Sequence, residues 1–145
     1  MTSNQQGARV RAPVPASAVD LLARGDAELV AATFSQEAST RFVHAHVAAL
    51  RAGAALVQVS GRPVRRPPLR TVWDMVAAVA PELSGWAAYF ADNAAARSAI
   101  EAGRPGVVDD ERAELTLAAA EDFHAAVRAR IGLDPVGAPG LSRAG

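Results

Sequence analysis

The sequence has 145 residues, about the length of one domain, and half of them are hydrophobic, which suffices for one modest core. Its 15 basic residues, all of them arginine, equal its 15 acidic residues in number, so no net charge attracts the chain to nucleic acid or to an acidic membrane. The absence of cysteine excludes disulfides and thiolate metal sites, and we expect neither a metal nor another cofactor.

The two ends of the chain differ in composition from its middle. Residues 1–16 are polar and contain Pro13 and Pro15, while residues 132–145 are rich in proline and glycine, so we expect a disordered N-terminal tail and a flexible C-terminal tail. The N-terminus lacks the apolar middle of a signal peptide, and no apolar run nears the ~20 residues of a membrane span. We therefore expect a cytoplasmic protein with one helical domain over residues 17–131.

The domain is predicted to begin with two short helices. Ser17 suits the N-cap of a helix over residues 18–24, which Gly25 would end. Asp26 would then cap a second helix over residues 27–34.

A longer helix, over residues 37–60, is predicted to form the centre of the fold. This stretch has no proline, and on a helical wheel its side chains separate into two sides. Arg41, His44 and Arg51 lie on the polar side, where Ala48 and Ala52 also fall. The other side is broad and apolar, as expected for a helix that contacts several neighbours. It comprises Phe42, His46, Leu50, Gly53 and Val57.

The next segment, residues 61–70, is the only strongly basic part of the chain. Its three prolines exclude a helix and favour an extended backbone. Its four arginines, with no acidic residue among them, are Arg62, Arg65, Arg66 and Arg70. They are either a solvated connection between helices or a loop that contacts nucleic-acid phosphates. No aromatic residue is interleaved with them, so the loop offers no platform on which bases would stack.

Two helices are predicted after this loop. Thr71 is the expected N-cap of a helix over residues 72–79, which Pro81 stops. Ser84 is the expected N-cap of a helix over residues 85–100, which Gly103 closes.

The last helix is predicted to begin at Asp109 or Asp110 and to end at Gly132, with acidic residues in its first turn as the helix dipole favours. No strand pattern occurs in the sequence. The expected fold is therefore an all-α compact bundle of about five or six helices with antiparallel neighbours.

One pair of residues on the central helix has catalytic chemistry. A histidine can move a proton to or from a ribose 2′-hydroxyl, and an arginine can stabilise the charge on the phosphorus centre, so Arg41 and His46 are the minimum of a metal-independent endoribonuclease. Five residues apart, they point about 140° away from each other on a straight helix. They would meet across a symmetric dimer, or if Arg41 lay in a bent first turn. The alternative, which we favour, is a hydrogen-bonded core histidine and a surface arginine.

Several stretches together resemble a known family. They are residues 41–55 (RFVHAHVAALRAGAA), 72–75 (VWDM), 80–83 (APEL) and 86–90 (WAAYF). Their order is similar to that in the actinobacterial family of SAV-6107-like HEPN domains, and the resemblance covers about residues 17–131. It implies an α-helical bundle that often dimerises. Many HEPN domains cut RNA as toxins or defence nucleases through an Arg-x4–6-His motif, in which Arg41 and His46 would be the catalytic residues, whereas others bind nucleotides or act as partners.

We therefore expect a HEPN-like helical domain that acts as a non-catalytic module, associated with nucleic acid or nucleotides or binding a partner. The alternative is a metal-independent endoribonuclease of the toxin or defence type that uses Arg41 and His46. The expected partners are a second copy of the chain in a homodimer, and RNA, a nucleotide or an antitoxin-like protein.

Overall fold

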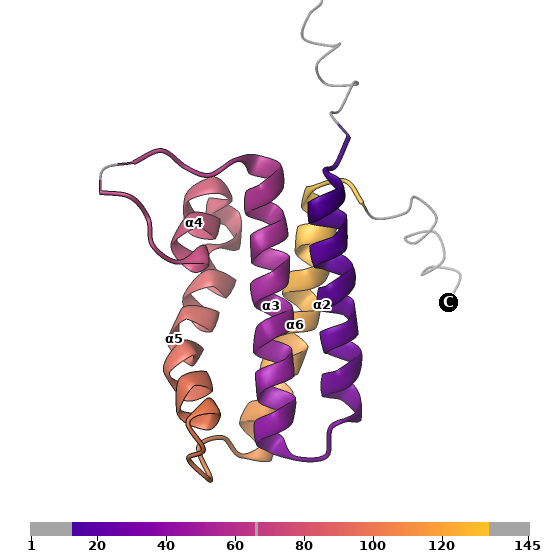
Figure 1. The fold of residues 1–145 in the computed structure, drawn as a ribbon, viewed down its shortest axis with the longest axis vertical. Coiled ribbons are helices and arrows are strands. Elements are labelled where there is room, and N and C mark those ends of the chain that lie inside the picture. The colour runs from indigo at the N-terminus through magenta and orange to yellow at the C-terminus, as the bar shows by residue number, and fades with distance from the viewer. Residues whose placement is uncertain (1–12, 66, 134–145) are drawn as a thin grey trace, which may run out of the picture.

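The computed structural model describes residues 13–65 and 67–133, and within them it is an all-α bundle without strands. Its helices are α2 (Ala16–Phe34), α3 (Ala38–Ser60), α4 (Val72–Val79), α5 (Ser84–Glu101) and α6 (Asp110–Arg130), with a short 3-10 helix, η1 (Pro81–Leu83), before α5. Figure 1 shows α2, α3, the α4–α5 arm and α6 running alternately down and up. The predicted fold class is therefore confirmed. Most of the two predicted tails, 1–16 and 132–145, lies outside the described residues.

Helix α3 is the centre of the bundle and contacts α2, α4, α5 and α6. Of its predicted apolar side, Phe42, His46, Gly53 and Val57 are buried, whereas Leu50 is only half-buried. Ala48 and Ala52 were assigned to the polar side but are fully buried, because neighbouring helices cover this side of α3 as well: an added Cβ at Gly25 of α2 would lie 3.4 Å from the Ala48 carbonyl oxygen.

The burial of α3 also explains its unusual apolarity. It is the one described helix that is long and apolar enough to cross a membrane by length and composition, and 56% of that window is buried inside the bundle. A helix that several neighbours cover needs apolar residues on most of its surface. A membrane-spanning role is therefore not indicated.

Helix α2 is continuous, so the predicted break at Gly25 is wrong. Gly25 is buried in the middle of the helix, where an added Cβ would lie 3.2 Å from Cδ2 of His124 and 3.4 Å from the carbonyl oxygen of Ala48. The glycine thus permits close contact with α3 and α6. It does not end the helix, since no positive φ occurs there.

The predicted helix starts are partly confirmed. The hydroxyl of Thr71 accepts a hydrogen bond from the Asp74 backbone N–H at 3.0 Å, and the carboxylate of Asp109 accepts one from the Arg112 N–H at 2.8 Å, so both are N-caps. Ser17 and Ser84 instead lie inside α2 and α5. At Ser84 the reason is that Pro81 begins a 3-10 turn that leads directly into α5.

The core is centred on aromatic rings from different helices. Trp73 of α4 stacks on Phe90 of α5 with ring centroids 5.2 Å apart, and Phe90 lies 5.7 Å from Phe123 of α6. These contacts fix the α4–α5 arm against the rest of the bundle.

Candidate functional site

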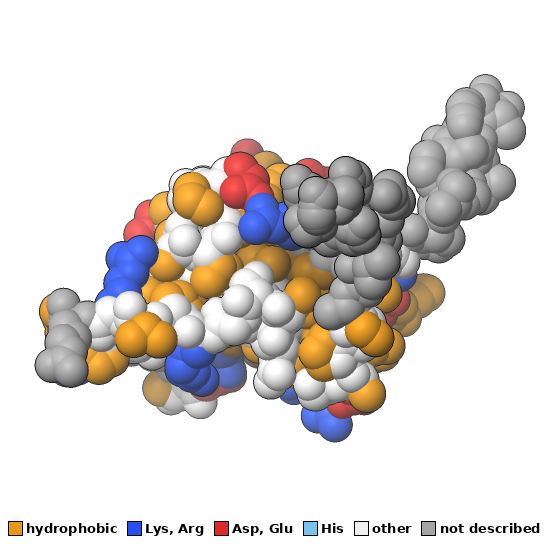
Figure 2. Space-filling model, turned by 90° about the horizontal axis from the view of Figure 1, so that it is seen from above, with side chains coloured by type: hydrophobic (Ala, Val, Ile, Leu, Met, Phe, Trp, Pro, Cys, Tyr) orange, Lys and Arg blue, Asp and Glu red, His pale blue; other side chains and the backbone are white. Residues whose placement is uncertain are grey.

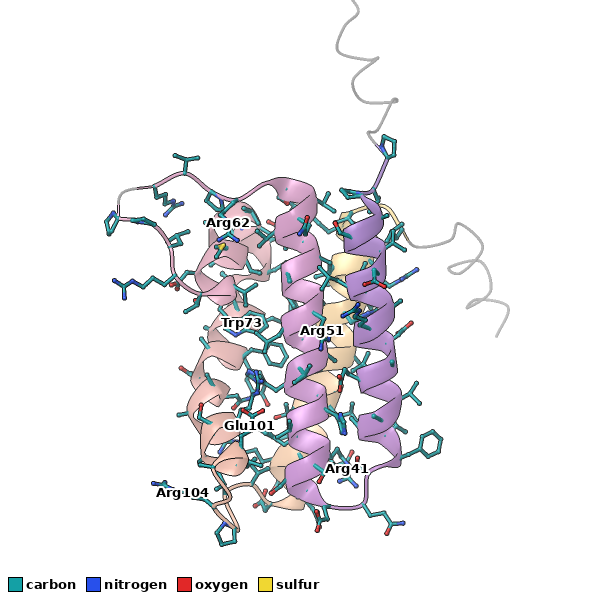
Figure 3. All side chains as sticks on the ribbon, viewed as in Figure 1. Arg41, Arg51, Arg62, Trp73, Glu101 and Arg104 are labelled. Carbon is teal, nitrogen blue, oxygen red and sulfur yellow. The ribbon has the colours of Figure 1, made fainter. Side chains whose placement is uncertain are left out.

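Arg41 lies in the first turn of α3, at the lower end of the bundle in Figure 3. Its Nη2 donates a hydrogen bond of 2.5 Å to the Ser35 carbonyl, and its Nη1 lies 3.1 Å from a carboxylate oxygen of Glu114 on α6. The side chain is only 13% exposed. Arg41 is thus not a free surface arginine, because it joins the turn between α2 and α3 to α6.

His46, one and a half turns further along α3, contacts the opposite part of the bundle. Its ring stacks on Phe42 at 6.2 Å between centroids and meets Trp73 and Phe90 edge-on at 6.2 and 6.1 Å. It is 2% exposed, and its Nδ1 has no hydrogen-bond partner among the described residues. The predicted core position is therefore found, but without the expected hydrogen bond.

Burial controls the charge of this histidine. Loss of solvation and the nearby Arg97 lower the pKa of His46 to about 4, with Glu101 acting in the other direction. His46 is consequently neutral at physiological pH. Because Arg41 binds α6 and His46 faces α4 and α5, one chain does not bring the two residues together.

His46 does reach the edge of a surface hollow. It lines a pocket of about 400 Å³ together with Thr71, Trp73, Arg97 and Glu101. A second pocket, of about 330 Å³, adjoins the first one, since Arg97, Leu50 and Val72 line both; Arg51 lies in the second. Figure 3 shows Arg51 on α3 and Glu101 near the lower end of α5. We call this double hollow the α3–α5 groove.

Arg51 and Arg97 were not predicted as site residues. Arg51 was assigned to the polar side of α3 without a role, and nothing in the sequence indicates that Arg97 lies beside it. Only the docking of α5 against α3 brings the two together, and this depends on packing between distant parts of the chain.

The arginine loop, residues 61–70, stands out from the helices between α3 and α4 (Figure 1). Arg62, Arg65 and Arg70 are exposed, and Arg66 lies outside the described residues. Arg62 donates a weak hydrogen bond to the Met75 sulfur at 3.6 Å. Seen from above, the loop forms a projecting edge of the molecule with basic side chains beside it (Figure 2).

The loop arginines differ from most arginines on the helices in their lack of an acidic partner. Within residues 13–65 and 67–133, no carboxylate pairs with Arg62, Arg65 or Arg70. By contrast, ion pairs join Arg24 to Asp20, Arg41 to Glu114, Arg97 to Glu101 and Arg130 to Glu82. The loop therefore carries positive charge that the described residues do not neutralise, although the chain as a whole is neutral.

The other two histidines have structural contacts. Nδ1 of His44 lies 2.6 Å from Glu28, and Nε2 of His124 lies 3.0 Å from the Leu22 carbonyl oxygen, so both connect α2 to its neighbours. In the described part of the chain, no three His, Cys, Asp or Glu side chains are grouped closely enough to hold a metal ion.

Comparison with known families gives one match. The profile of SAV-6107-like HEPN domains matches residues 32–128, which is more than half of the chain. The chain belongs to the SAV-6107-like HEPN family. No curated protein and no solved structure matches it. In this HEPN domain the matched stretch includes α3 to almost the end of α6, while most of α2 precedes it.

Proposed function

We propose that this HEPN domain is a non-catalytic module that binds single-stranded nucleic acid through its phosphates, with the arginine loop as the contact surface. The observation that carries the proposal is the unneutralised charge of the loop, at which Arg62, Arg65 and Arg70 are exposed without a carboxylate partner in the described part of the chain. Phosphate contacts of this kind supply affinity without reading sequence.

The extended backbone of the loop supports the same function. Pro63, Pro67 and Pro68 limit the conformations of the free loop, so less conformational entropy is lost when it binds. An extended segment also places successive arginines along a line, as successive phosphates of a strand require. Base stacking has no part here, since the loop has no aromatic side chain.

The test is a binding measurement with a fluorescent single-stranded RNA. Replacing Arg62, Arg65, Arg66 and Arg70 with serine should weaken binding by at least tenfold, since each arginine removed loses a phosphate contact. The melting temperature should hardly change, because the described members of the set are exposed.

The matched control removes the same charge from the helices and the turn after α5. Serine at Arg24, Arg104, Arg128 and Arg130 should leave RNA binding within about twofold, provided that the variant still melts cooperatively. Equal loss in both quadruple variants would reduce the effect to net charge and would overturn the proposed role of the loop.

The alternative function, an endoribonuclease that uses Arg41 and His46, has less support. Arg41 is bound to Glu114 and to the Ser35 carbonyl, and His46 is enclosed by aromatic rings on the other side of α3. Cleavage by this pair would need a second copy of the chain to complete the site. We expect no cleavage of single-stranded RNA in EDTA. Cleavage that disappears in folded Arg41→Ala and His46→Gln variants would instead establish the nuclease.

A further inference from the structure

A pocket lies between the last turns of α3 and helix α4. Its volume is about 350 Å³, at the lower end of the range for small-molecule sites. Apolar side chains from both helices form most of its wall, namely Ala54 and Val57 of α3 and Val72 and Met75 of α4. The lining is completed where α3 ends and the arginine loop begins, by Gln58, Gly61 and Arg62. We call this hollow the α3–α4 pocket.

The backbone geometry of α3 accounts for the pocket. At Gly53 an added Cβ would lie 3.3 Å from a methyl group of Val76 and 3.4 Å from one of Val72, so α3 and α4 are in close contact there. The pocket begins immediately beyond this contact, at Ala54. Gly61, with a φ of 86°, then turns the chain out of the helix, so α3 does not extend past the pocket.

Arg62 places a positive charge at the pocket. Its Nη1 lies 3.6 Å from the sulfur of Met75, so the guanidinium is directed at α4 and not at the outer end of the loop (Figure 3). A thioether is only a weak acceptor. Within residues 13–65 and 67–133, no carboxylate pairs with Arg62 and none lines the pocket. The guanidinium therefore has strong donors available for an anion, next to an apolar wall.

These surroundings favour a ligand with one anionic group and an apolar body. A planar carboxylate can accept two parallel hydrogen bonds from one guanidinium. An aliphatic chain attached to it would contact the apolar wall, and each methylene group that it buries should strengthen binding about fourfold. A nucleotide fits less well, because no aromatic ring is among the described lining residues and only Gln58 and Arg62 offer polar side chains.

We propose that the α3–α4 pocket binds a medium-chain fatty acid, with Arg62 as the ligand of the carboxylate and the aliphatic chain between α3 and α4. The site shares Arg62 with the proposed nucleic-acid surface, but binding of the fatty acid does not depend on that function.

Calorimetry with three compounds tests the class of ligand. Octanoate has both the carboxylate and the chain, butyrate has the carboxylate with a short chain, and octan-1-ol has the chain without the charge. Octanoate should bind at least tenfold more tightly than either of the others. Equal affinity for butyrate would mean that the chain contributes nothing, and equal affinity for octanol would mean the same for the carboxylate. Either result would overturn the proposal, as would the absence of octanoate binding.

Variants locate the site. Arg62→Gln should weaken octanoate binding about tenfold, as expected when a charged hydrogen bond is lost, whereas Arg104→Gln, which removes an exposed charge after α5, should leave it unchanged. Because Arg62 is exposed, its variant should fold normally, so unchanged octanoate affinity in Arg62→Gln would overturn the proposal.

A second variant fills the pocket. Ala54 is half-buried and lines the hollow, so the larger side chain in Ala54→Leu should occupy the space of the aliphatic chain and abolish octanoate binding. Undiminished binding to this variant, with a cooperative melt retained, would place the chain elsewhere and would contradict the proposed site.

The shared arginine has a consequence for RNA that rests on the proposed function. An arginine that holds a carboxylate in the pocket does not contact an RNA phosphate, so saturating octanoate should weaken RNA binding about two- to threefold, the share of one arginine among the four of the loop. By linkage, RNA should weaken octanoate binding by the same factor. Unchanged RNA affinity at saturating octanoate would contradict this shared use of Arg62.

The two proposals fail separately. A protein that binds octanoate but not RNA would overturn the proposed function and leave the pocket supported. A protein that binds RNA but not octanoate would overturn the pocket and leave the function of the loop supported.

Discussion

The polar imidazole ring of His46 lies in almost wholly apolar surroundings. Phe42, Trp73 and Phe90 surround it, and Nδ1 finds no partner among the described residues. Such a ring is tolerated only in its neutral form, because a charged imidazolium would lose its hydration without gaining a counter-ion at contact distance. The pKa of His46 is lowered to about 4 because the folded protein favours this neutral form.

This burial makes the stability of the fold depend on pH. In the unfolded chain the pKa of His46 is about 6.5, above the folded value of about 4, so protonation favours the unfolded state. The contribution is fully present above pH 6.5 and is lost as the pH falls towards 4. Between pH 7.5 and pH 5 the free energy of unfolding should decrease by about 2 kcal/mol from this residue alone.

Urea denaturation of the unaltered protein and of His46→Gln at both pH values isolates the effect, since glutamine does not titrate. Arg97 and Glu101, the charged groups that act on His46, remain in both proteins. The unaltered protein should lose about 2 kcal/mol more than the variant on acidification. An equal loss in both would show that the pKa of His46 is the same in the folded and unfolded states, which contradicts its burial among the aromatic rings.

Two glycines within helices, Gly25 of α2 and Gly85 of α5, have very different surroundings. Gly25 lies where α2, α3 and α6 meet, and an added Cβ there would come within 3.2 Å of the buried ring of His124 and 3.4 Å of the Ala48 carbonyl oxygen. The ring of His124 is held by its hydrogen bond to the Leu22 carbonyl, and a carbonyl oxygen of the central helix has little freedom to move. Gly85, near the start of α5, has open space around it.

The same substitution at these two positions should therefore change stability in opposite directions. Alanine is favoured over glycine in a helix by about 1 kcal/mol, so Gly85→Ala should stabilise the protein by up to that amount. Gly25→Ala should destabilise it by about 1–3 kcal/mol, because the crowding at His124 and Ala48 exceeds the gain in helix propensity. Thermal melts of the two variants measure both effects. A more stable Gly25→Ala variant would mean that the helices separate easily at this point.

Local signals in the sequence predicted the elements well. Thr71 and Asp109 were recognisable as N-caps from residue type, and Gly103 follows the end of α5 with a positive φ, as its position suggested. Gly25 was misassigned because a glycine that ends a helix and one that permits close packing look the same in a sequence. Only the neighbouring helices distinguish them.

Across the whole molecule, the two parts of the candidate site, the arginine loop and the α3–α5 groove, were not equally predictable from the sequence. The arginine loop was predictable, because its four arginines are adjacent in the chain and its prolines exclude a helix. The α3–α5 groove was not, because Arg51 and Arg97 meet only once α3 and α5 have docked. The close packing of α3 against α4 is equally hard to predict, since it relies on Gly53, where an added Cβ would lie 3.3 Å from a methyl group of Val76.

The neutral total charge of the chain conceals an uneven distribution of charge over the molecule. Glu114 on α6 is paired with Arg41 and Glu82 before α5 with Arg130, so part of the acidic charge is neutralised within the bundle. The positive charge of the loop is not neutralised in this way, because the loop projects away from these acids (Figure 1). A protein with no net charge can therefore still present a local surface for phosphates.

The most direct test of this account is the salt dependence of binding to single-stranded RNA. If the four loop arginines each replace one counterion, the logarithm of the association constant should fall with the logarithm of salt concentration with a slope of about −3. The variant with serine at all four positions should show a slope near zero, with its melting temperature retained. An unchanged slope in the folded variant would contradict the account, because the phosphate contacts would then lie elsewhere on the molecule.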